Sequence, residues 1–390
     1  MINILSSNKD LNKILNLFFI VFFGFYLRIF ISRYGHNFDY EMWVLNLDLY
    51  NNDKSIYNYG RYNYGPIWIW LLSFLDKINL QFISDLDFLR FKIIIFLSIV
   101  DFFIFILLFK KYNLKIASFF FLNPISIFIT GYHNQFDNFA ILIALYAFIN
   151  FEQNQLILRN YKSLFCLFLL GLSLCTKHIM FLFPLWLAIG QKKFLDKIIV
   201  ILIPYTIFLF SFVPYLNDIN GILTNVFFYQ SYNNAPIWNL IVPRAINDYI
   251  GKFILFTSTI IILGFYFRKN NINYKFLMYL ICVVIFSSGI YNQYLAIPLV
   301  SIAILWNNYF LIYTLLTIFL FLGDGDALNI NFFDFDWNLK FTRLVYHPIL
   351  LFLLFGFLRI NDKKNILLIK LKKLLKIVVF EIKNQFNLKN

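Results

Sequence analysis

The sequence predicts an all-helical polytopic membrane protein, and three observations lead to this fold class. Hydrophobic residues occupy 61% of the 390 positions, whereas charged residues occupy only 14%. The mean hydropathy is +0.70, which is too apolar for a chain that hides its side chains in one soluble core. The lysines and arginines lie between long apolar stretches instead of among aromatic residues on a polar face. The net charge of +14 therefore does not indicate a nucleic-acid partner.

Twelve apolar stretches are the predicted membrane helices. Basic clusters separate many of them, and the positive-inside rule places such clusters in the cytoplasm. With the N-terminus inside, both termini are cytoplasmic. Several stretches are shorter than the roughly 20 residues of a straight span, so we expect polar ends to extend them or helices that break inside the protein. The expected spans are 14–33, 91–109, 116–130, 138–151, 164–176, 179–190, 198–213, 253–267, 276–290, 294–306, 308–322 and 344–358.

The spans and the loops between them form a single predicted transmembrane domain, 1–358. The stretch 65–75 is ambiguous, and we expect it to be re-entrant or interfacial because a further span would turn the lysine clusters outward. The tail 359–390 alternates lysine with leucine and isoleucine, which predicts a basic amphipathic helix on the anionic cytoplasmic leaflet. Three cysteines lie in apolar segments without metal or redox spacing and are expected to be small buried side chains: Cys166, Cys175 and Cys282.

This threading gathers the polar groups on the outer side. The outer segments are 34–90, 131–138, 176–178, 214–252, 288–294 and the acidic loop 323–343. All four histidines fall there or at adjoining helix ends: His36, His133, His178 and His347. An enzyme that works at the outer leaflet would show this distribution. A transporter would more plausibly carry its polar groups at the midplane of the bilayer.

The first outer loop, 34–90, holds the best candidate for a catalytic base. Asp39 and Glu41 come just after the first predicted span. A carboxylate where a helix leaves the membrane is partly desolvated, which raises its pKa and suits it to accept a proton from a hydroxyl. The alternative is an ordinary solvated loop whose tyrosines and tryptophans form an aromatic belt at the headgroups.

Several motifs of the chain resemble the GT-C glycosyltransferases, polytopic enzymes that take a sugar from a polyprenyl phosphate. In the first loop, an acidic FDYE (38–41) is followed by SIY (55–57) and YNYGP (62–66), where the family commonly has Tyr-Pro-Pro. GYHNQFDN (131–138) is similar to the Gly-x-x-x-Gln-Phe-Asp element of bacterial members and relatives of mannosyltransferases. Residues 172–194 resemble the family's two short helices joined by a lysine turn, and 229–240 and 291–299 match weaker patterns.

The resemblance implies an inverting hexosyltransferase of the cell envelope. The implied donor is a polyprenyl-phosphate sugar, and the implied acceptor is a lipid-linked glycan or glycolipid, with membrane lipids as further partners. Asp39 would be the general base and Glu41 the reserve. We expect no cofactor and no metal, because no clustered acidic ligand set is present. The expected location is the bacterial inner (plasma) membrane, with the active site facing the periplasm or outside.

The leaving phosphate needs compensating positive charge. Lys177 and His178 are the best placed, in the turn between two short helices, and His133 of GYHNQFDN approaches the phosphate in the resemblance. Arg244 is a further candidate, with Arg343 and His347 as lesser ones: these positions lie in or beside the outer loops. A lysine near the membrane surface can also snorkel to the headgroups, which is the alternative for Lys177.

The residues expected to bind the sugar or the acceptor are Gln135, Asp137, Tyr62, Tyr64, Trp238 and Tyr294. Asp137 also precedes an apolar run, so it is equally suited to be the N-cap of a helix. Capping alone leaves the neighbouring His-Asn-Gln unexplained.

Other hypotheses stay open on the sequence. Asp101 lies inside an apolar stretch, where we expect it to pair with a cation or with a neighbouring helix and to be structural. A lipid-linked oligosaccharide flippase or other transporter is the main alternative function, although the halves show no internal repeat and 14 glycines are few for broken-helix paths. A membrane-bound O-acyltransferase would need a histidine deep in the bundle, and His133-Asn134 is the pair to consider for it.

Overall fold

The computed structural model describes residues 8–78, 88–229, 236–242, 251–323 and 339–362, and throughout this range the regular structure is helical. The predicted all-helical class is confirmed for these residues. The tail after 362, the acidic loop 324–338, Arg244 and the side chain of Arg343 lie outside the described part. The predictions made for them therefore stay predictions.

The first half of the chain forms the helices that surround the polar motifs of the sequence. They are α1 (Asn8–Ser32), α2 (Phe38–Asn51), α3 (Ile56–Tyr59), α4 (Ile67–Lys77), α5 (Phe88–Lys111), α6 (Leu114–Phe121), α7 (Pro124–Phe128), the π-helical η1 (Ile129–His133), α8 (Asp137–Phe148), α9 (Tyr161–Thr176), the 3₁₀ turn η2 (His178–Met180) and α10 (Phe183–Ile189). With 11 residues, α4 is too short to cross a membrane alone, which agrees with the expectation for 65–75.

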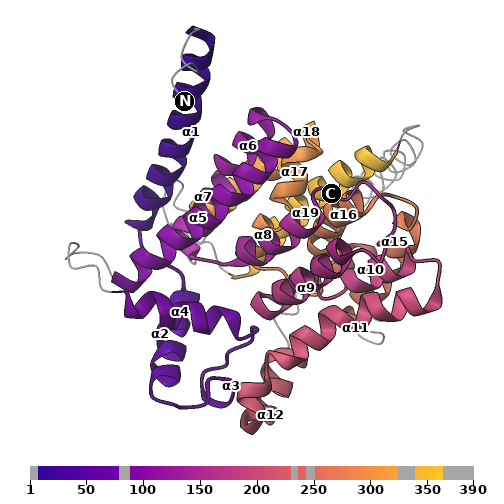
Figure 1. Ribbon diagram of the computed structural model, residues 1–390. Helices are drawn as coiled ribbons and strands as arrows, with labels where there is room; N and C mark the ends of the chain where they lie inside the picture. Colours follow the sequence, from indigo (N-terminus) through magenta and orange to yellow (C-terminus); the bar gives the residue numbers. More distant parts are fainter. Residues whose placement is uncertain (1–7, 79–87, 230–235, 243–250, 324–338, 363–390) are drawn as a thin grey trace, which may run out of the picture.

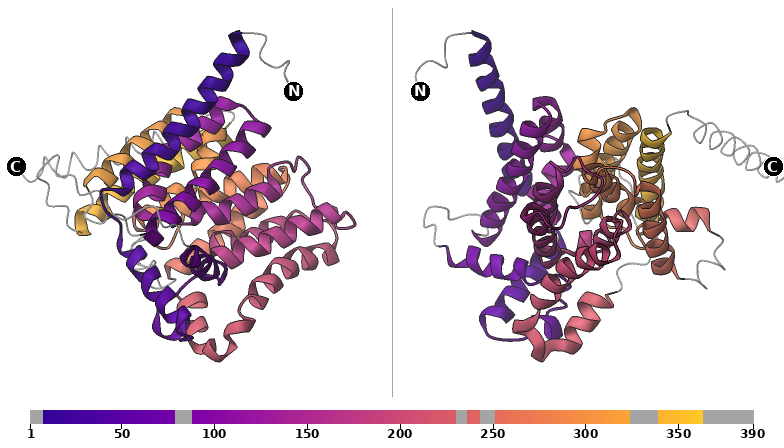
Figure 2. Two further views of the ribbon diagram at one scale, coloured as in Figure 1. Left: turned by 60° about the vertical axis from the view of Figure 1, so that its left-hand side comes forward. Right: turned by 45° about the vertical axis from the view of Figure 1, so that its right-hand side comes forward.

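The second half adds a long bent element and the helices that close the bundle. They are α11 (Phe194–Phe210), η3 (Val213–Asp218), α12 (Ile219–Ile222), η4 (Leu223–Phe227), α13 (Pro236–Ile241), α15 (Lys252–Phe267), α16 (Ile272–Ile285), η5 (Asn292–Ala296), α17 (Leu299–Ile304), α18 (Asn308–Gly323) and α19 (Leu339–Asn361). The α1 helix lies at one edge of the bundle, and its N-terminal part extends beyond the other helices (Figure 1 and Figure 2).

Each of the twelve predicted stretches contains helix, but their lengths differ. Two helices of the described residues are long and apolar enough to cross a membrane, Ile14–Ser32 and Phe88–Lys111. Two bent pairs meet the same criterion together: Leu114–Phe121 with Pro124–His133, bent by 43°, and Phe194–Phe210 with Val213–Phe227, bent by 68°. The remaining stretches form apolar helices of 10–17 residues. Length and composition therefore support two to four spans among the described residues, and the count of twelve stays a prediction.

Asparagine side chains begin many of these helices. Each accepts a hydrogen bond from a backbone N–H of the first turn, which satisfies a donor that has no partner inside the helix. Between α6 and α7, Asn123 has this role and Pro124 occupies the first helical position, so the chain breaks and restarts there. The other asparagine caps are Asn113 of α6, Asn160 of α9 and Asn271 of α16.

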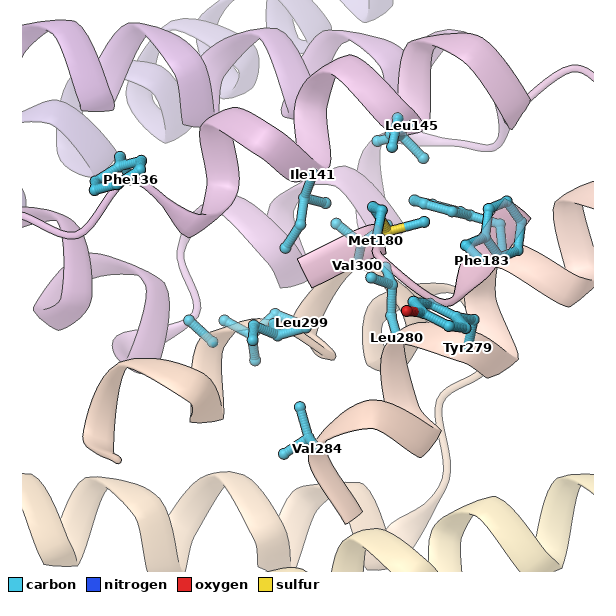
Figure 3. Close-up of a cluster of buried hydrophobic side chains, with 14 of the residues drawn as sticks. Phe136, Ile141, Leu145, Met180, Phe183, Tyr279, Leu280, Val284, Leu299 and Val300 are labelled. Carbon is cyan, nitrogen blue, oxygen red and sulfur yellow. The ribbon is translucent and has the colours of Figure 1, made fainter. Parts of the chain in front are cut away.

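The core that supports the site lies between α8, α10, α16 and α17. Figure 3 shows Ile141 and Leu145 of α8 facing Met180, Phe183 and the α16 side chains across this core. Tyr279 of α16 accepts a hydrogen bond from Leu182 N at 3.1 Å and donates one to Ile179 O at 3.0 Å. This hydroxyl fixes the η2 turn directly after Lys177. The three cysteines are free thiols and buried, as predicted.

Two of the predicted outer segments, 34–90 and 214–252, contact each other. The helices α2, α3, α4 and α12 gather at the end of the molecule opposite the start of α1 (Figure 1). Asn58 Nδ2 donates to Asp218 Oδ1 at 3.1 Å, and Trp70 Nε1 donates to the Tyr215 hydroxyl at 2.8 Å. The predicted membrane topology places these two segments on the same side, and the fold brings them together.

Candidate active site

The GYHNQFDN segment forms a tight turn between η1 and α8. The π-helical η1 ends at Asn134, whose φ of 57° is in the left-handed region that asparagine tolerates. The Asn134 amide donates to Thr130 O at 3.1 Å and to Gly131 O at 3.2 Å, and its Oδ1 accepts from Arg90 Nε at 3.1 Å. Because the asparagine closes the turn locally, the side chains of His133, Gln135 and Asp137 are held in fixed positions.

These side chains form a continuous polar chain with the start of α2 and the end of α9. Gln135 donates from Nε2 to Asp39 Oδ2, and its Oε1 accepts from Lys177 Nζ at 3.3 Å. Lys177 Nζ in turn lies 2.7 Å from Asp137 Oδ2. One amide therefore joins the predicted base to the predicted phosphate-binding cation. We call the following residues the Asp39 network: Asn37, Asp39, His133, Gln135, Asp137 and Lys177.

His133 enters the network through Asn37. Its Nδ1 lies 2.8 Å from Asn37 Nδ2, and the same amide nitrogen is 3.4 Å from Asp39 Oδ2. An amide NH₂ group can only donate, so His133 Nδ1 accepts, and a neutral imidazole then carries its proton on Nε2. Phe128, Tyr132 and Phe321 pack against the ring. His133 thus presents one N–H donor inside an aromatic pocket.

The electrostatics of Asp39 suit a general base. Asp39 is half-buried in the first turn of α2. Burial raises the pKa of its carboxyl above the usual range, and the nearby Lys177 ammonium and the hydrogen bonds from Asn37 and Gln135 offset part of that rise. A carboxylate whose pKa is raised in this way binds a proton more strongly than an ordinary aspartate. This is the property that the sequence predicts for Asp39.

Lys177 ends α9 and is buried, with 4% of its surface exposed. Its Nζ lies 5.2 Å from the centroid of the Tyr64 ring and 4.8 Å from that of Phe136. Trp68 stacks on Phe136, with 4.1 Å between the ring centroids. A buried ammonium is stable only with partners, which Asp137, Gln135 and the two rings supply. The snorkelling alternative for Lys177 is wrong, because the amine points into the protein.

Several buried polar atoms of the network have no hydrogen-bond partner within the described part of the chain. They are Asn37 Oδ1, His133 Nε2 and Asp137 Oδ1. Buried polar groups are nearly always hydrogen-bonded, so an unpartnered set is a place where a polar ligand gains hydrogen bonds. These atoms are one N–H donor and two oxygen acceptors within the Asp39 network.

Two glycines allow the close contacts that form the site. A Cβ on Gly65 would lie 1.9 Å from Cys175 O, so the YNYGP segment packs directly on the backbone of α9 two residues before Lys177. A Cβ on Gly131 would lie 2.5 Å from Arg28 O, where η1 packs on α1. The glycine of the Tyr-Gly-Pro sequence is thus a requirement of this packing.

The remaining predicted residues have different environments. Glu41 is exposed on α2, which agrees with its reserve position. Tyr64 belongs to the site: burial, with added effects of Asp39 and Tyr294, raises the pKa of its hydroxyl well above the usual range. Tyr294 of η5 is therefore within electrostatic range of the Tyr64 hydroxyl. His178 is half-buried in η2, and its Nδ1 has no partner among the described residues.

Two residues predicted to bind sugar are used by the fold instead. The Tyr62 hydroxyl donates to Gly65 O and accepts from Ile69 N, both at 3.0 Å, and so holds the start of α4. Trp238 donates from Nε1 to Phe286 O at 2.8 Å and packs on the same residue. His347 is half-buried on α19. These contacts give no support to a ligand role for Tyr62 or Trp238.

The capping alternative for Asp137 is also wrong. Asp137 is the first residue of α8, the N-cap position belongs to Phe136, and no side chain caps this helix. The carboxylate pairs with Lys177 instead. Its place in the first turn still favours a negative charge, because the N-terminal end of a helix carries partial positive charge.

Two residues that organise the site were not predicted from the sequence. Asn37 precedes α2 and links His133 to Asp39. Arg90 Nη2 donates to Ser32 O at 2.8 Å and to Gly35 O, so Arg90 joins the end of α1 to the Asn134 turn. Asparagine is frequent in this chain, and Arg90 looks like one more basic residue beside a predicted span. Neither position carries a signal in the sequence that separates it from its neighbours.

Comparisons with known proteins add no assignment. No protein-family model matches the sequence, and no curated protein matches it. Within the described residues, no group of three or more His, Cys, Asp or Glu is arranged to hold a metal ion.

Proposed function

We propose that the protein is an inverting glycosyltransferase that moves a monosaccharide from a polyprenyl-phosphate donor to a lipid-linked glycan or glycolipid acceptor. One observation carries the proposal. A half-buried carboxylate, Asp39, is joined through the single amide of Gln135 to a buried lysine, Lys177. A base for the acceptor hydroxyl and a cation for the donor phosphate are the two groups this transfer requires.

The reaction follows from the charges of these groups. Asp39 accepts the proton of the acceptor hydroxyl as the acceptor oxygen forms a bond to the anomeric carbon. The bond between that carbon and the phosphate oxygen breaks, and the polyprenyl phosphate leaves with the electron pair. Attack opposite the leaving group inverts the configuration. Asp39 loses one negative charge as the phosphate gains one, so the net charge near Lys177 is unchanged during the step.

The other residues of the site have supporting roles in this proposal. Lys177 faces the developing phosphate charge, with Asp137 and Gln135 fixing its position. The unpartnered atoms of His133, Asn37 and Asp137 bind hydroxyl groups of the sugar or the acceptor. The Tyr64 ring lies against the Lys177 amine, and Tyr294 is within electrostatic range of Tyr64. Aromatic faces of this kind are suited to the apolar face of a sugar ring.

The proposal includes the membrane arrangement of a twelve-span GT-C-like protein. The apolar helices of 10–17 residues are too short to cross the membrane alone. They would cross it in pairs or together with their polar ends. The basic clusters would face the cytoplasm and the Asp39 network the outside. An active site at the outer face is where a lipid-linked donor delivered across the membrane becomes accessible.

A transporter of lipid-linked glycans is the second candidate function. The observation that favours it is the buried pair of Arg28 and Asp101, which lies on two candidate spans. Intramembrane charges of this kind often mark transport paths. In this fold, however, the side chains of Ser126, Thr130 and Asn138 form hydrogen bonds with the pair.

The deciding experiment is sugar transfer by the purified protein in liposomes. A panel of radiolabelled synthetic polyprenyl-phosphate monosaccharides is offered with short-chain lipid-linked acceptors. We expect one donor to be consumed and the product to have the opposite anomeric configuration. If no donor of the panel is consumed while a fluorescent lipid-linked oligosaccharide crosses the bilayer faster than in protein-free liposomes, the protein is a transporter and the proposal is wrong.

A further inference from the structure

Asp101 lies behind the Asp39 network, fully buried within α5. Its Oδ2 accepts hydrogen bonds from Arg28 Nε at 3.0 Å and Thr130 Oγ1 at 2.7 Å, and Arg28 Nη2 is 2.9 Å away. Ser126 Oγ donates to the same oxygen at 3.2 Å. Its Oδ1 accepts from Asn138 Nδ2 at 2.6 Å. Four segments of the chain thus meet on one carboxylate.

The two closest partners of Asp101 have a particular place in the sequence. Thr130 directly precedes the turn 131–137, and Asn138 directly follows it. They bind opposite oxygens of the carboxylate. The carboxylate therefore closes the base of the turn that carries three network residues, His133, Gln135 and Asp137.

We infer that Asp101 is a positioning residue that holds both ends of the turn 131–137, so that Gln135 stays bonded to Asp39 and Asp137 to Lys177. Asp101 touches neither the base nor the cation. It acts through the backbone of the turn, which also packs on α1 at Gly131. For its effect on catalysis, the inference rests on the proposed function.

The chemistry of the position explains why a carboxylate is needed. Arg28, Ser126, Thr130 and Asn138 all donate to it. A carboxylate only accepts, through two oxygens, whereas an amide would turn an NH₂ group toward one set of donors. Arg28 also supplies the counter-charge that a buried carboxylate requires, and it donates to Gly24 O at 2.9 Å.

The consequence for Asp39 is electrostatic. The Gln135 hydrogen bond lowers the pKa of Asp39, so an opened turn raises that pKa further. Other groups act on Asp39 as well and must stay unchanged in a valid test. They are Lys177 and Asp137 within the network, Tyr64 and Tyr229 beside it, and His133 through Asn37.

The test compares single substitutions that spare Arg28 and Asp101. Thr130→Val and Asn138→Leu each remove the hydrogen bond between Asp101 and one end of the turn, with little change in side-chain volume. The control, Ser126→Ala, removes a hydrogen bond to the same carboxylate from a residue outside the turn. Hydrogen exchange of the backbone amides of 131–137 is measured on the purified protein. Losing a hydrogen bond to a charged group predicts about ten- to hundredfold faster exchange in the first two variants. Ser126→Ala should exchange like wild type, and Thr130→Ser, which keeps the hydroxyl, should restore protection.

If Thr130→Val and Asn138→Leu leave the exchange of 131–137 unchanged, or if Ser126→Ala raises it equally, Asp101 does not hold the turn and the inference is wrong. The second readout is the pH profile of sugar transfer. Its acidic limb should move to higher pH in the two turn variants and stay in place in Ser126→Ala. A wild type without transfer would remove the proposed function, but the exchange result would still decide the structural role of Asp101.

Discussion

Lys177 forms an ion pair with Asp137, with 2.7 Å between Nζ and Oδ2, and both side chains are buried. The pair joins the end of α9 to the start of α8, two helices that pack along each other. Gln135 extends the contact to Asp39 on α2. Three separate segments of the sequence thus share one set of charges.

Removing Lys177 should destabilise the protein. Lys177→Met leaves the buried carboxylate of Asp137 without its partner, which typically costs about 3–5 kcal/mol of unfolding free energy. The matched control is Lys111→Met, which removes the partner of the exposed Glu152 and should have little effect. Denaturation midpoints in detergent measure both variants. Equal midpoints would show that the Lys177–Asp137 pair is not buried as described.

Gln135→Leu should change the protonation of Asp39. The variant removes the amide that donates to Asp39, so the carboxyl binds its proton more tightly and the acidic limb of the transfer rate moves to higher pH. Gln153→Leu, at an exposed position, is the control. An acidic limb that stays at the wild-type position in Gln135→Leu would exclude this hydrogen bond from the catalytic arrangement.

The wild-type rate should itself depend on the pKa of Asp39. Because the base must be ionised, transfer should fall as the pH drops through a value above the ordinary 3.8. The folded state binds this proton more tightly than the unfolded chain. The folding stability from Asp39 is therefore fully present below the unfolded pKa and is lost as the pH rises through the folded pKa. Transfer rates and denaturation midpoints measured over the same pH range check both directions of change. A transfer rate that stays constant down to the pH of an ordinary aspartate pKa would contradict the raised pKa of Asp39.

Gly65→Ala should impair activity without a change of charge. The added Cβ would collide with Cys175 O, and the shift needed to relieve the collision moves Lys177. A displacement of about 1 Å at a reacting group can reduce the rate about 100-fold. The control for general packing damage is Gly264→Ala. Its added Cβ would collide with the Trp186 side chain instead of the backbone beside Lys177. Transfer should fall in Gly65→Ala well below the level in Gly264→Ala, and equal rates would contradict the packing argument.

The sequence predicts the helical class and much of the site for physical reasons. Composition and apolar stretches determine the helices, and the threading places Asp39, GYHNQFDN and Lys177 on one side, where the fold brings them together. Pairing is harder to predict. Asp137 looks like an N-cap but pairs with Lys177, and Tyr62 looks like a ligand group but holds α4. Such choices depend on which donors tertiary packing brings near.

Span lengths are a second limit of the sequence. The hydropathy of 116–130 suggests one membrane helix, yet Asn123 and Pro124 break it and η1 widens its end. The cap and the proline are local features of the sequence. The 43° bend between the two helical parts forms where α7 and η1 pack against α1, which the local sequence does not show. The break that hydropathy does not show lies directly before the polar turn that carries Gln135 and Asp137.

The role of Asp39 as the base is tested most directly by comparing Asp39→Asn with Glu41→Gln in the sugar-transfer assay. Both variants remove one carboxylate from the first turn of α2, but only Asp39 contacts Gln135. Asp39→Asn should lower the transfer rate by about 10²–10⁴-fold, the usual range for a general base, while binding of the labelled donor is retained. Glu41→Gln should remain near the wild-type rate. Transfer that survives in Asp39→Asn, or that is lost only in Glu41→Gln, would contradict the assignment of Asp39 as the base.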